Sequence, residues 1–446
     1  MTDIPEYSIS KYRSITWSAL APWLIFIVVL WAAVNTSFHK DYKEGAIEAD
    51  AKGYYAYLPA VFIYHDLNFG FFDQIERTTY SNPNLYYDYR MDISHKMIDR
   101  YYAGTAVCLL PFFLAGHSIT LLTGLPADGY SYYYMLMVHI GALFYFLLGL
   151  LGLRRLLRTY QVTEKNIALV LAAMVFGTNL FYYVVTEFGM SHLYSFTAIT
   201  WLCVTIRAYF SGYKIKYLVY SALLLGMITL IRPVNLLVVL AIPFLASDTD
   251  SLIIEIRNLF SKSWVLILAI TSFIVVVSIQ LVIYKISTGS FFVDSYQQFG
   301  FNFLKPEIIN FLFSYRKGMF VYTPLLLLSL VGFVYLFRSS RYQFYTLLGF
   351  LSIVIYVLSS WFMWFYGGSF SQRVMIEFYP FFSILLAIAM QKIVNRKSKI
   401  VFLSLMFLAV ILCQVQTYQY RRMQIHWSDM NKEKYWDVFM RIDKLK

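Results

Sequence analysis

Long apolar runs separated by short polar segments are the dominant pattern of this chain. Nine of the runs are long enough, or nearly long enough, to cross a bilayer as a helix. They cover residues 16–36, 130–153, 167–185, 193–210, 264–286, 319–337, 342–361, 374–390 and 400–414. The first run follows Lys11 and Arg13 and has no cleavage site after it, so we expect a retained span rather than a signal peptide.

Two further apolar stretches do not predict a single simple crossing. Residues 102–123 are long enough to cross but contain Pro111, together with a glycine and a histidine. Residues 217–246 are interrupted by Arg232 and Pro233, which favours either one kinked crossing or two short ones.

The basic residues of the polar segments favour one arrangement of these stretches. If the N-terminus is cytoplasmic, residues 102–123 only dip into the outer face and residues 217–246 cross twice, then four basic clusters fall inside, as the positive-inside rule requires. These clusters are residues 154–158, 214–216, 338–341 and 395–399. We therefore expect an all-α polytopic membrane protein, a bundle of about eleven transmembrane helices.

This arrangement predicts one transmembrane domain over residues 1–416 and an outer tail over residues 417–446. A first outer loop, residues 37–129, contains juxtamembrane helices, and residues 287–318 form a second long outer loop. The part of the first loop from 38 to 100 carries ten of the 25 acidic residues of the chain. With the shorter outer turns at 186–192 and 364–373, four polar segments are expected to converge on one face of the bundle.

Composition excludes the main alternatives to a membrane protein. The chain has 446 residues, 59% of them hydrophobic and only 14% charged, and a soluble domain could not hide that much apolar surface. The net charge of +12 comes from clusters between apolar runs, so it does not indicate a nucleic-acid partner. The three cysteines lie inside apolar runs and predict neither a disulfide framework nor a zinc site.

Asp50 and Glu48 are the acids of most chemical interest. They follow the first span by about twelve residues and precede an aromatic block that includes Tyr54 and Tyr55. Outer-loop acids are usually only solvated, but a carboxylate here can also serve as the general base of a sugar transfer. The tyrosines suit sugar stacking and interfacial anchoring equally well.

These features together resemble a known superfamily. An acid in the first outer loop, followed by aromatic residues and a Pro/Gly-interrupted stretch that does not cross, resembles the GT-C glycosyltransferases, which include protein O-mannosyltransferases and aminoarabinose transferases of lipid A. Three more stretches are similar to motifs of bacterial members of that superfamily. They are RYYAGTAVCLLPFFLAGH (100–117), YRKGMFVYTPLLLLSLVG (315–332) and WFMWFYGGSFSQRVMIEFYPFF (361–382).

The resemblance implies an enzyme of the bacterial inner membrane, with its site facing the periplasm, that uses a polyprenyl-phosphate sugar and inverts the anomeric configuration. A first-loop acid then deprotonates the hydroxyl of a lipid, glycan or protein acceptor. Family members often carry an adjacent acid pair, whereas this chain has Glu-Ala-Asp, so either Glu48 or Asp50 is the match; we favour Asp50 because it directly precedes the aromatic block.

Basic residues near the outer face are candidates to hold the donor phosphate, because arginine and lysine stabilise the charge of a departing phosphate. We select Arg316, Lys317, Arg373 and Arg100. For Arg316, Lys317 and Arg100 the alternative is anchoring of lipid headgroups. For Arg373 the alternative is an internal salt bridge with Glu377, four residues on.

Glu187 and His192 flank a turn at the outer end of two apolar runs. Contact with a sugar or acceptor is one interpretation and structural hydrogen bonding is another. A divalent metal is possible here but not indicated, because two residues do not make a metal site, and no other cofactor is predicted.

The sequence thus favours an inverting glycosyltransferase whose partners are a polyprenyl-phosphate donor, an acceptor and membrane lipids. No nucleotide-binding motif is present, which fits a lipid-linked donor. The alternatives are a transporter or flippase of lipid-linked glycans, an O-antigen-type ligase, and a non-catalytic member of an envelope complex. A transporter would place polar residues at the bilayer midplane, whereas these acids gather at an outer edge.

Overall fold

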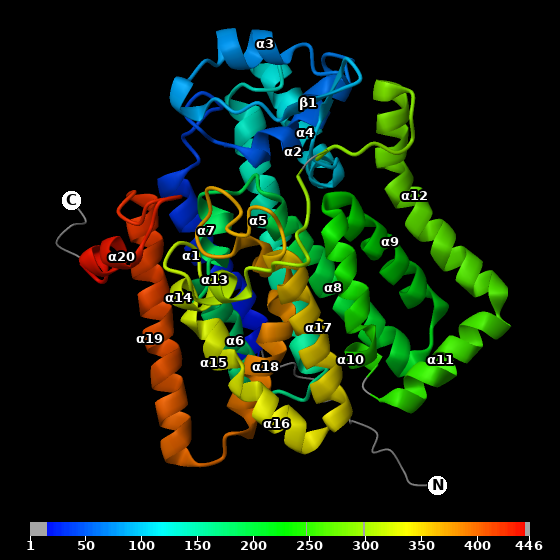
Figure 1. The fold of residues 1–446 in the computed structure, drawn as a ribbon, viewed down its shortest axis with the longest axis vertical. Helices are drawn as coiled ribbons and strands as arrows, with labels where there is room; N and C mark the ends of the chain where they lie inside the picture. The colour runs from blue at the N-terminus through cyan, green and yellow to red at the C-terminus, as the bar shows by residue number, and fades with distance from the viewer. Residues whose placement is uncertain (1–15, 247, 298, 442–446) are drawn as a thin grey trace.

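Helices dominate the structure because an apolar run in lipid has to satisfy its backbone hydrogen bonds within itself. The computed structural model describes residues 16–246, 248–297 and 299–441, and it shows a helical bundle with a smaller cap at one end (Figure 1). Lys11, Arg13 and the last residues of the predicted tail, 442–446, lie outside the described residues.

Eight helices of the described chain are long and apolar enough to cross a membrane, and a bent pair, Pro233–Ala246 with Thr249–Ser261, would make nine. The eight are α1 (Trp17–Thr36), α4 (Gly104–Thr123), α5 (Tyr132–Arg158), α8 (Ser191–Gly212), α12 (Ser263–Thr288), α17 (Arg341–Ser359), η4 with α18 (Arg373–Phe378, Tyr379–Lys392) and α19 (Arg396–Arg421). The chain is therefore an all-helical polytopic membrane protein, as predicted.

Two predicted continuous runs are instead broken. Residues 167–185 form α6 (Glu164–Phe176) and α7 (Leu180–Val185). Between them the hydroxyl of Thr178 bonds the carbonyl of Met174 and accepts from the amide of Leu180, which gives the backbone an alternative to the helix.

Residues 319–337 form α14 (Met319–Tyr322), α15 (Pro324–Ser329) and α16 (Val331–Ser339). Pro324 begins α15, where its missing N–H costs least, and the chain bends before it.

The predicted break at Arg232-Pro233 is confirmed. α9 (Ile215–Ile231) ends at Arg232, and η3 (Pro233–Ala241), a 3₁₀ helix, continues into α10 (Ile242–Ala246). Then α11 (Thr249–Ser261) turns by 120° and leads to α12. The N-terminus of α4 crosses the end of α9 closely, since a β-carbon on Gly104 would lie 2.3 Å from the amide nitrogen of Ile231.

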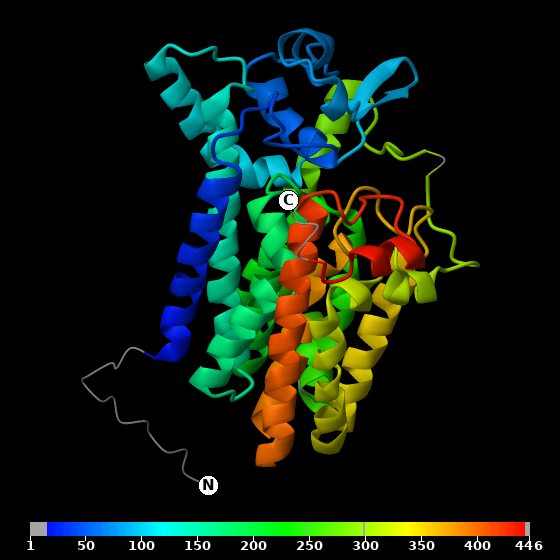
Figure 2. The same ribbon diagram turned by 90° about the vertical axis from the view of Figure 1, so that its left-hand side faces the viewer.

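The bundle has two distinct ends (Figure 2). At the end that we call the basic end, Arg154 donates to Ser18 at 2.8 Å and Arg158 pairs with Glu164 at 3.2 Å. All four basic clusters, residues 154–158, 214–216, 338–341 and 395–399, lie at this end. At the other end, which we call the site end, Ser37 bonds the carbonyl of Val185 and Arg421 bonds Thr36.

A cap built from the first loop covers part of the site end (Figure 1). It contains α2 (Asp50–Phe62), α3 (Phe72–Gln74), η1 (Ile75–Thr79), η2 (Pro83–Leu85) and an antiparallel hairpin of β1 (Arg90–Ile93) and β2 (Lys96–Asp99). Juxtamembrane helices were predicted, but the hairpin was not, because strands of four residues leave little periodic signal. Two further short helices, α13 (Ile308–Phe313) and α20 (Lys432–Val438), lie at the same end.

The contacts of α4 place it beside one half of α5. The hydroxyl of Tyr145 bonds the carbonyl of Cys108, and Gly116 lies against Tyr133 and Tyr134 near the start of α5. α4 therefore runs antiparallel to the half of α5 nearer the cap and extends past its beginning. Length and composition alone would let α4 cross, so its dipping into the outer face stays a prediction.

Candidate active site at the site end

Asp50 is the first residue of α2, where the positive end of the helix dipole favours a carboxylate. The preceding residue, Ala49, has φ 45°, a left-handed conformation that is costly for a residue with a β-carbon. Residues 51–60 are buried on every side of α2. All but the last turn of the helix is thus enclosed by protein, and the helix holds Asp50 in a fixed direction.

Two tyrosines from the cap bind one oxygen of Asp50. The hydroxyl of Tyr101 donates to Oδ1 at 2.7 Å, and that of Tyr87 donates to the same oxygen at 3.3 Å. The two tyrosine oxygens are 2.6 Å apart. Asp50 therefore belongs to a hydrogen-bonded group of phenols rather than to bulk water.

Tyr101 is itself held by three further contacts. Its ring lies 4.7 Å from that of Tyr54, its carbonyl accepts from Tyr57, and its amide donates to Asp99. A β-carbon on Gly53 would lie 2.4 Å from the Tyr101 ring, so this position of α2 needs a glycine. Tyr54 and Tyr57 therefore position Tyr101, and the buried tyrosines of the aromatic block face protein rather than a lipid interface.

Arg373 binds the other oxygen of Asp50. Its Nη2 lies 2.5 Å from Oδ2, and the pair joins residues 323 apart in the sequence. The side chains are 10% and 17% exposed, so the pair is sheltered but not fully closed to solvent. Arg373 begins η4 after Ser371, whose φ is 56°, and Asn179 holds the preceding loop through the carbonyl of Phe370.

Arg373 decides the charge of Asp50. Burial raises the pKa of the Asp50 carboxyl, but the Arg373 guanidinium and the Tyr101 hydroxyl lower it further than burial raises it. The net pKa lies below the usual value, and Asp50 is therefore ionised at neutral pH.

A second charged cluster lies on η4, α8 and the α9–η3 break. Glu377 accepts from Nδ1 of His192 at 2.9 Å and pairs with Nη1 of Arg232 at 3.5 Å. The alternative interpretation of Arg373, a salt bridge with Glu377, is therefore wrong. η4 is a 3₁₀ helix, in which residues four apart point about 120° from each other rather than along one face.

Glu187 and Lys317 occupy sheltered positions within the electrostatic influence of Arg373. Burial raises the pKa of Glu187 to about 7, with a further contribution from Glu48, while Tyr182 donates to Glu187 at 3.2 Å. Lys317 is buried and donates to the carbonyl of Ser369, and burial lowers its pKa to about 7. Both groups therefore change charge close to neutral pH.

Four predicted site residues are engaged elsewhere or stand apart. Arg316 bonds the carbonyl of Ser428 at 2.7 Å and stacks on Phe365, with the guanidinium 3.5 Å from the ring centre. Arg100 bonds the carbonyls of Tyr89 and Asp88 within the cap. Tyr55 is buried and donates to the carbonyl of Gly129, and Glu48 is exposed two residues before Asp50.

Sequence reasoning missed Tyr87 and Tyr101 and treated Arg232 only as part of the break at Pro233. Tyr101 lies inside the stretch RYYAG, but nothing in one sequence separates it from the many other tyrosines of the loop. Arg232 had a stronger signal, because an arginine between two apolar segments at a proline break is an ionisable group at membrane depth.

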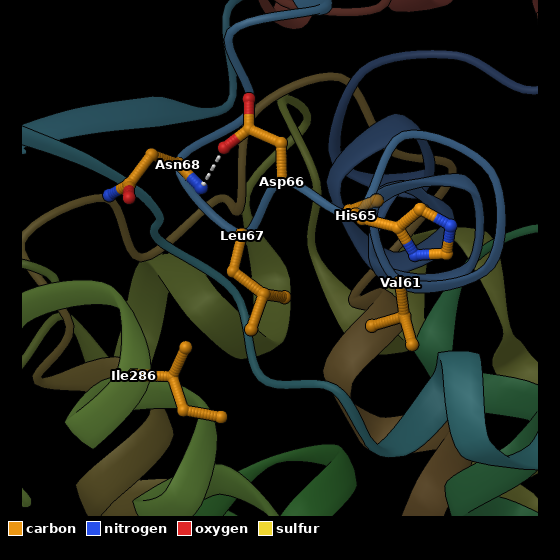
Figure 3. A pocket seen from close by; sticks show the side chains of 7 residues that line it. Val61, His65, Asp66, Leu67, Asn68 and Ile286 are labelled. Atoms are coloured by element: carbon orange, nitrogen blue, oxygen red, sulfur yellow. Dashed lines mark hydrogen bonds between the residues drawn. The ribbon is translucent and has the colours of Figure 1, made fainter.

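One surface cavity of the described chain lies on the cap side of the bundle and is not lined by Asp50. It has a volume of about 290 Å³ and lies between the end of α2 and the end of α12 (Figure 3). Asp66 and Asn68 line it, and the amide of Asn68 donates to Asp66 at 2.8 Å. None of the predicted site residues lines this cavity. Over the described ranges, no three His, Cys, Asp or Glu side chains are grouped closely enough to hold a metal ion.

Comparison with known proteins returned no match: no family model, no curated protein and no solved structure is similar to this chain.

Proposed function

We propose that the chain is an inverting membrane glycosyltransferase of the GT-C type that moves a sugar from a polyprenyl-phosphate donor to an acceptor hydroxyl. The observation that carries the proposal is the Asp50–Arg373 pair, which joins the first loop to the start of η4 at one end of the bundle. It puts a fixed carboxylate beside a guanidinium, the two groups that a displacement at a phosphate-linked anomeric carbon requires.

Asp50 is the proton acceptor in this mechanism. Oδ1 holds Tyr101 at 2.7 Å and Tyr87 at 3.3 Å, so the acceptor hydroxyl displaces Tyr87, the weaker partner. The acceptor oxygen then attacks the anomeric carbon while its proton passes to Asp50. One C–O bond forms and the bond to the phosphate oxygen breaks, which inverts the anomeric centre.

Two arginines stabilise the leaving phosphate, which departs with the bonding electron pair. Arg373 moves its hydrogen bonds from Asp50 to the phosphate, and the loss of this cation makes Asp50 a stronger base as the bond breaks. Arg232 is the second cation. Within the described chain its contacts run through Nη1, so Nε and Nη2 can bind phosphate oxygens.

The proposed topology follows from the two ends of the bundle. With the basic end in the cytoplasm, as the positive-inside rule favours, the Asp50–Arg373 pair faces the periplasm of a bacterial inner membrane. Counting α6–α7, α9, η3–α10 and α14–α16 as crossings assembled from short or broken helices, and α4 as a dipping helix, gives eleven crossings with a cytoplasmic N-terminus.

Mass spectrometry of lipids that co-purify in a mild detergent tests the proposal. A polyprenyl phosphate or its monoglycosyl form is the expected result, and it should be depleted in an Arg232→Met, Arg373→Met double variant that remains folded. A polyprenyl diphosphate that carries an oligosaccharide would replace the proposal with the ligase function. If only phospholipids are found and purified protein in vesicles moves lipid-linked glycans across the bilayer, the transporter function takes its place.

A further inference from the structure

Exposed apolar side chains recur along the second loop and on the neighbouring site end of α17. We call this surface the aromatic platform. Leu304 is 94% exposed and Ile309 is 78% exposed, which is unusual for side chains of this size. The platform consists of Phe301, Phe303, Leu304, Ile309, Phe313, Tyr356 and Phe362.

The backbone beneath the platform is fixed. The amide of Asn302 donates to the carbonyl of Ser360 at 2.6 Å, and that of Glu307 donates to Ser359 at 3.0 Å. Phe301 forms an isolated β-bridge with Trp361, and the hydroxyl of Tyr356 bonds the carbonyl of Phe303 at 2.7 Å. These contacts fix the loop in a conformation that leaves its apolar side chains exposed.

Stacked rings add to this rigidity. Phe301 and Phe303 stack with ring centres 5.5 Å apart, and Phe303 stacks on Tyr356 at 6.1 Å. Leaving an apolar surface exposed to water costs roughly 25 cal/mol for each Å² relative to burying it. Some apolar medium has to cover it.

The position of the platform identifies that medium. Tyr356 belongs to the exposed face of α17, together with Leu348 and Ile353, and α17 is long and apolar enough to cross the membrane. The platform continues this face beyond the last turn of the helix. We infer that the aromatic platform is seated in the lipid bilayer, at the boundary of headgroups and acyl chains, where aromatic side chains are enriched.

This inference goes beyond the proposed function and does not depend on it. Next to the platform, Tyr296 packs edge-on against Trp361 at 5.5 Å, and Trp361 in turn packs edge-on against Phe301 at 4.9 Å.

Fluorescence quenching of a labelled full-length chain in lipid vesicles tests the inference. The variant is Leu304→Cys, labelled with a polarity-sensitive fluorophore, and the control is Lys96→Cys, which is exposed in the β1–β2 hairpin of the cap. The native cysteines, Cys108, Cys203 and Cys413, are all buried and should contribute little label.

We expect brominated lipids to quench the label at 304 several-fold more than the label at 96, and aqueous iodide to show the opposite order. Equal iodide quenching at both positions would show that the platform faces water and would overturn the inference. Quenching of the 304 label by neither agent would show that protein covers it, which would also overturn the inference. Ile309→Cys provides a second position should Leu304→Cys fail to fold.

Discussion

Two ion pairs involve neighbouring positions of α2, Lys52 and Asp50. The pairs differ in exposure, in sequence separation and in hydrogen bonding. Lys52 pairs with Glu76 at 3.0 Å inside the cap, and both side chains are at most 4% exposed. Asp50 pairs with Arg373, far away in the sequence, and both side chains are partly accessible. One pair is local and closed, whereas the other joins the cap to the bundle.

The difference extends to how fully each pair is satisfied. Glu76 also accepts from the hydroxyl of Tyr42, and Lys52 also donates to the carbonyl of Leu85. In contrast, Nε of Arg373 is buried without a hydrogen-bond partner in the described chain. A closed network stabilises a fold, while an unsatisfied group beside an accessible carboxylate is typical of a site that awaits a ligand. We therefore propose a structural role in the cap for Lys52–Glu76 and a role in the proposed reaction for Asp50–Arg373.

Replacing Asp50 gives the largest expected effect. Asp50→Asn keeps the shape but cannot accept a proton, and we expect sugar transfer to fall by about 10³-fold, within the range for loss of a general base. The measurement is transfer to acceptor by membranes that hold equal amounts of folded protein.

The matched control is Glu48→Gln, two residues earlier and exposed, which should change the rate by less than about 3-fold. If Asp50→Asn transfers at the wild-type rate while Glu48→Gln does not, Glu48 is the base. If both are fully active, neither acid is catalytic.

Breaking the closed pair should instead damage stability. Lys52→Met leaves Glu76 buried without its cation, which costs about 3 kcal/mol of unfolding free energy. Thermal denaturation in detergent should show a lowered Tm, and the double variant Lys52→Met, Glu76→Gln should recover most of the loss because no charge remains buried.

Residual folded Lys52→Met protein should transfer sugar at a near-normal rate. A selective loss of rate at unchanged stability would contradict the division between the two pairs and place Lys52 in the site.

The sequence predicted the class of fold and much of the candidate site. Apolar periodicity identified the spans, and the break at Arg232 followed from its proline. Asp50 and Arg373 were both selected, although their contact was not foreseen, because a pairing over 323 residues leaves no local pattern. The breaks at Thr178 and Pro324 were missed because hydropathy averages over a single polar residue or proline in an apolar run.

The individual roles of the cations could not be read from the sequence. Arg316, Lys317 and Arg100 look equivalent to Arg373 as basic residues near an outer face. Their carbonyl partners, which engage them in the structure, are backbone groups that every residue carries, so only the fold selects among them.

Glu187 should make stability depend on pH near neutrality. Its folded pKa is raised from 4.5 to about 7, so the folded state binds this proton more tightly than the unfolded chain. Stability is therefore lost as pH rises from about 4.5 through 7. Glu187→Gln removes this dependence, and we expect the variant to gain about 1–2 kcal/mol over wild type at pH 8 and almost nothing at pH 4. Tm values across that range provide the measurement, and a parallel shift at every pH would refute the assignment.

The smallest expected effects come from removing two tyrosine hydroxyls of the cap, those of Tyr101 and Tyr55. Comparing the two variants tests whether a tyrosine acts on Asp50 or only stabilises the fold. Tyr101→Phe removes a hydrogen bond that lowers the pKa of Asp50, so the acid limb of the transfer rate should move to higher pH. Tyr55→Phe removes a bond to the carbonyl of Gly129, costs about 1 kcal/mol of stability and should leave the pH profile in place. Because both changes delete one buried hydroxyl, a structural role alone would give both variants the same profile. Under the proposed mechanism only a tyrosine bound to Asp50 shifts the acid limb, and an unshifted limb in Tyr101→Phe would show that Tyr101 does not act on the proton transfer.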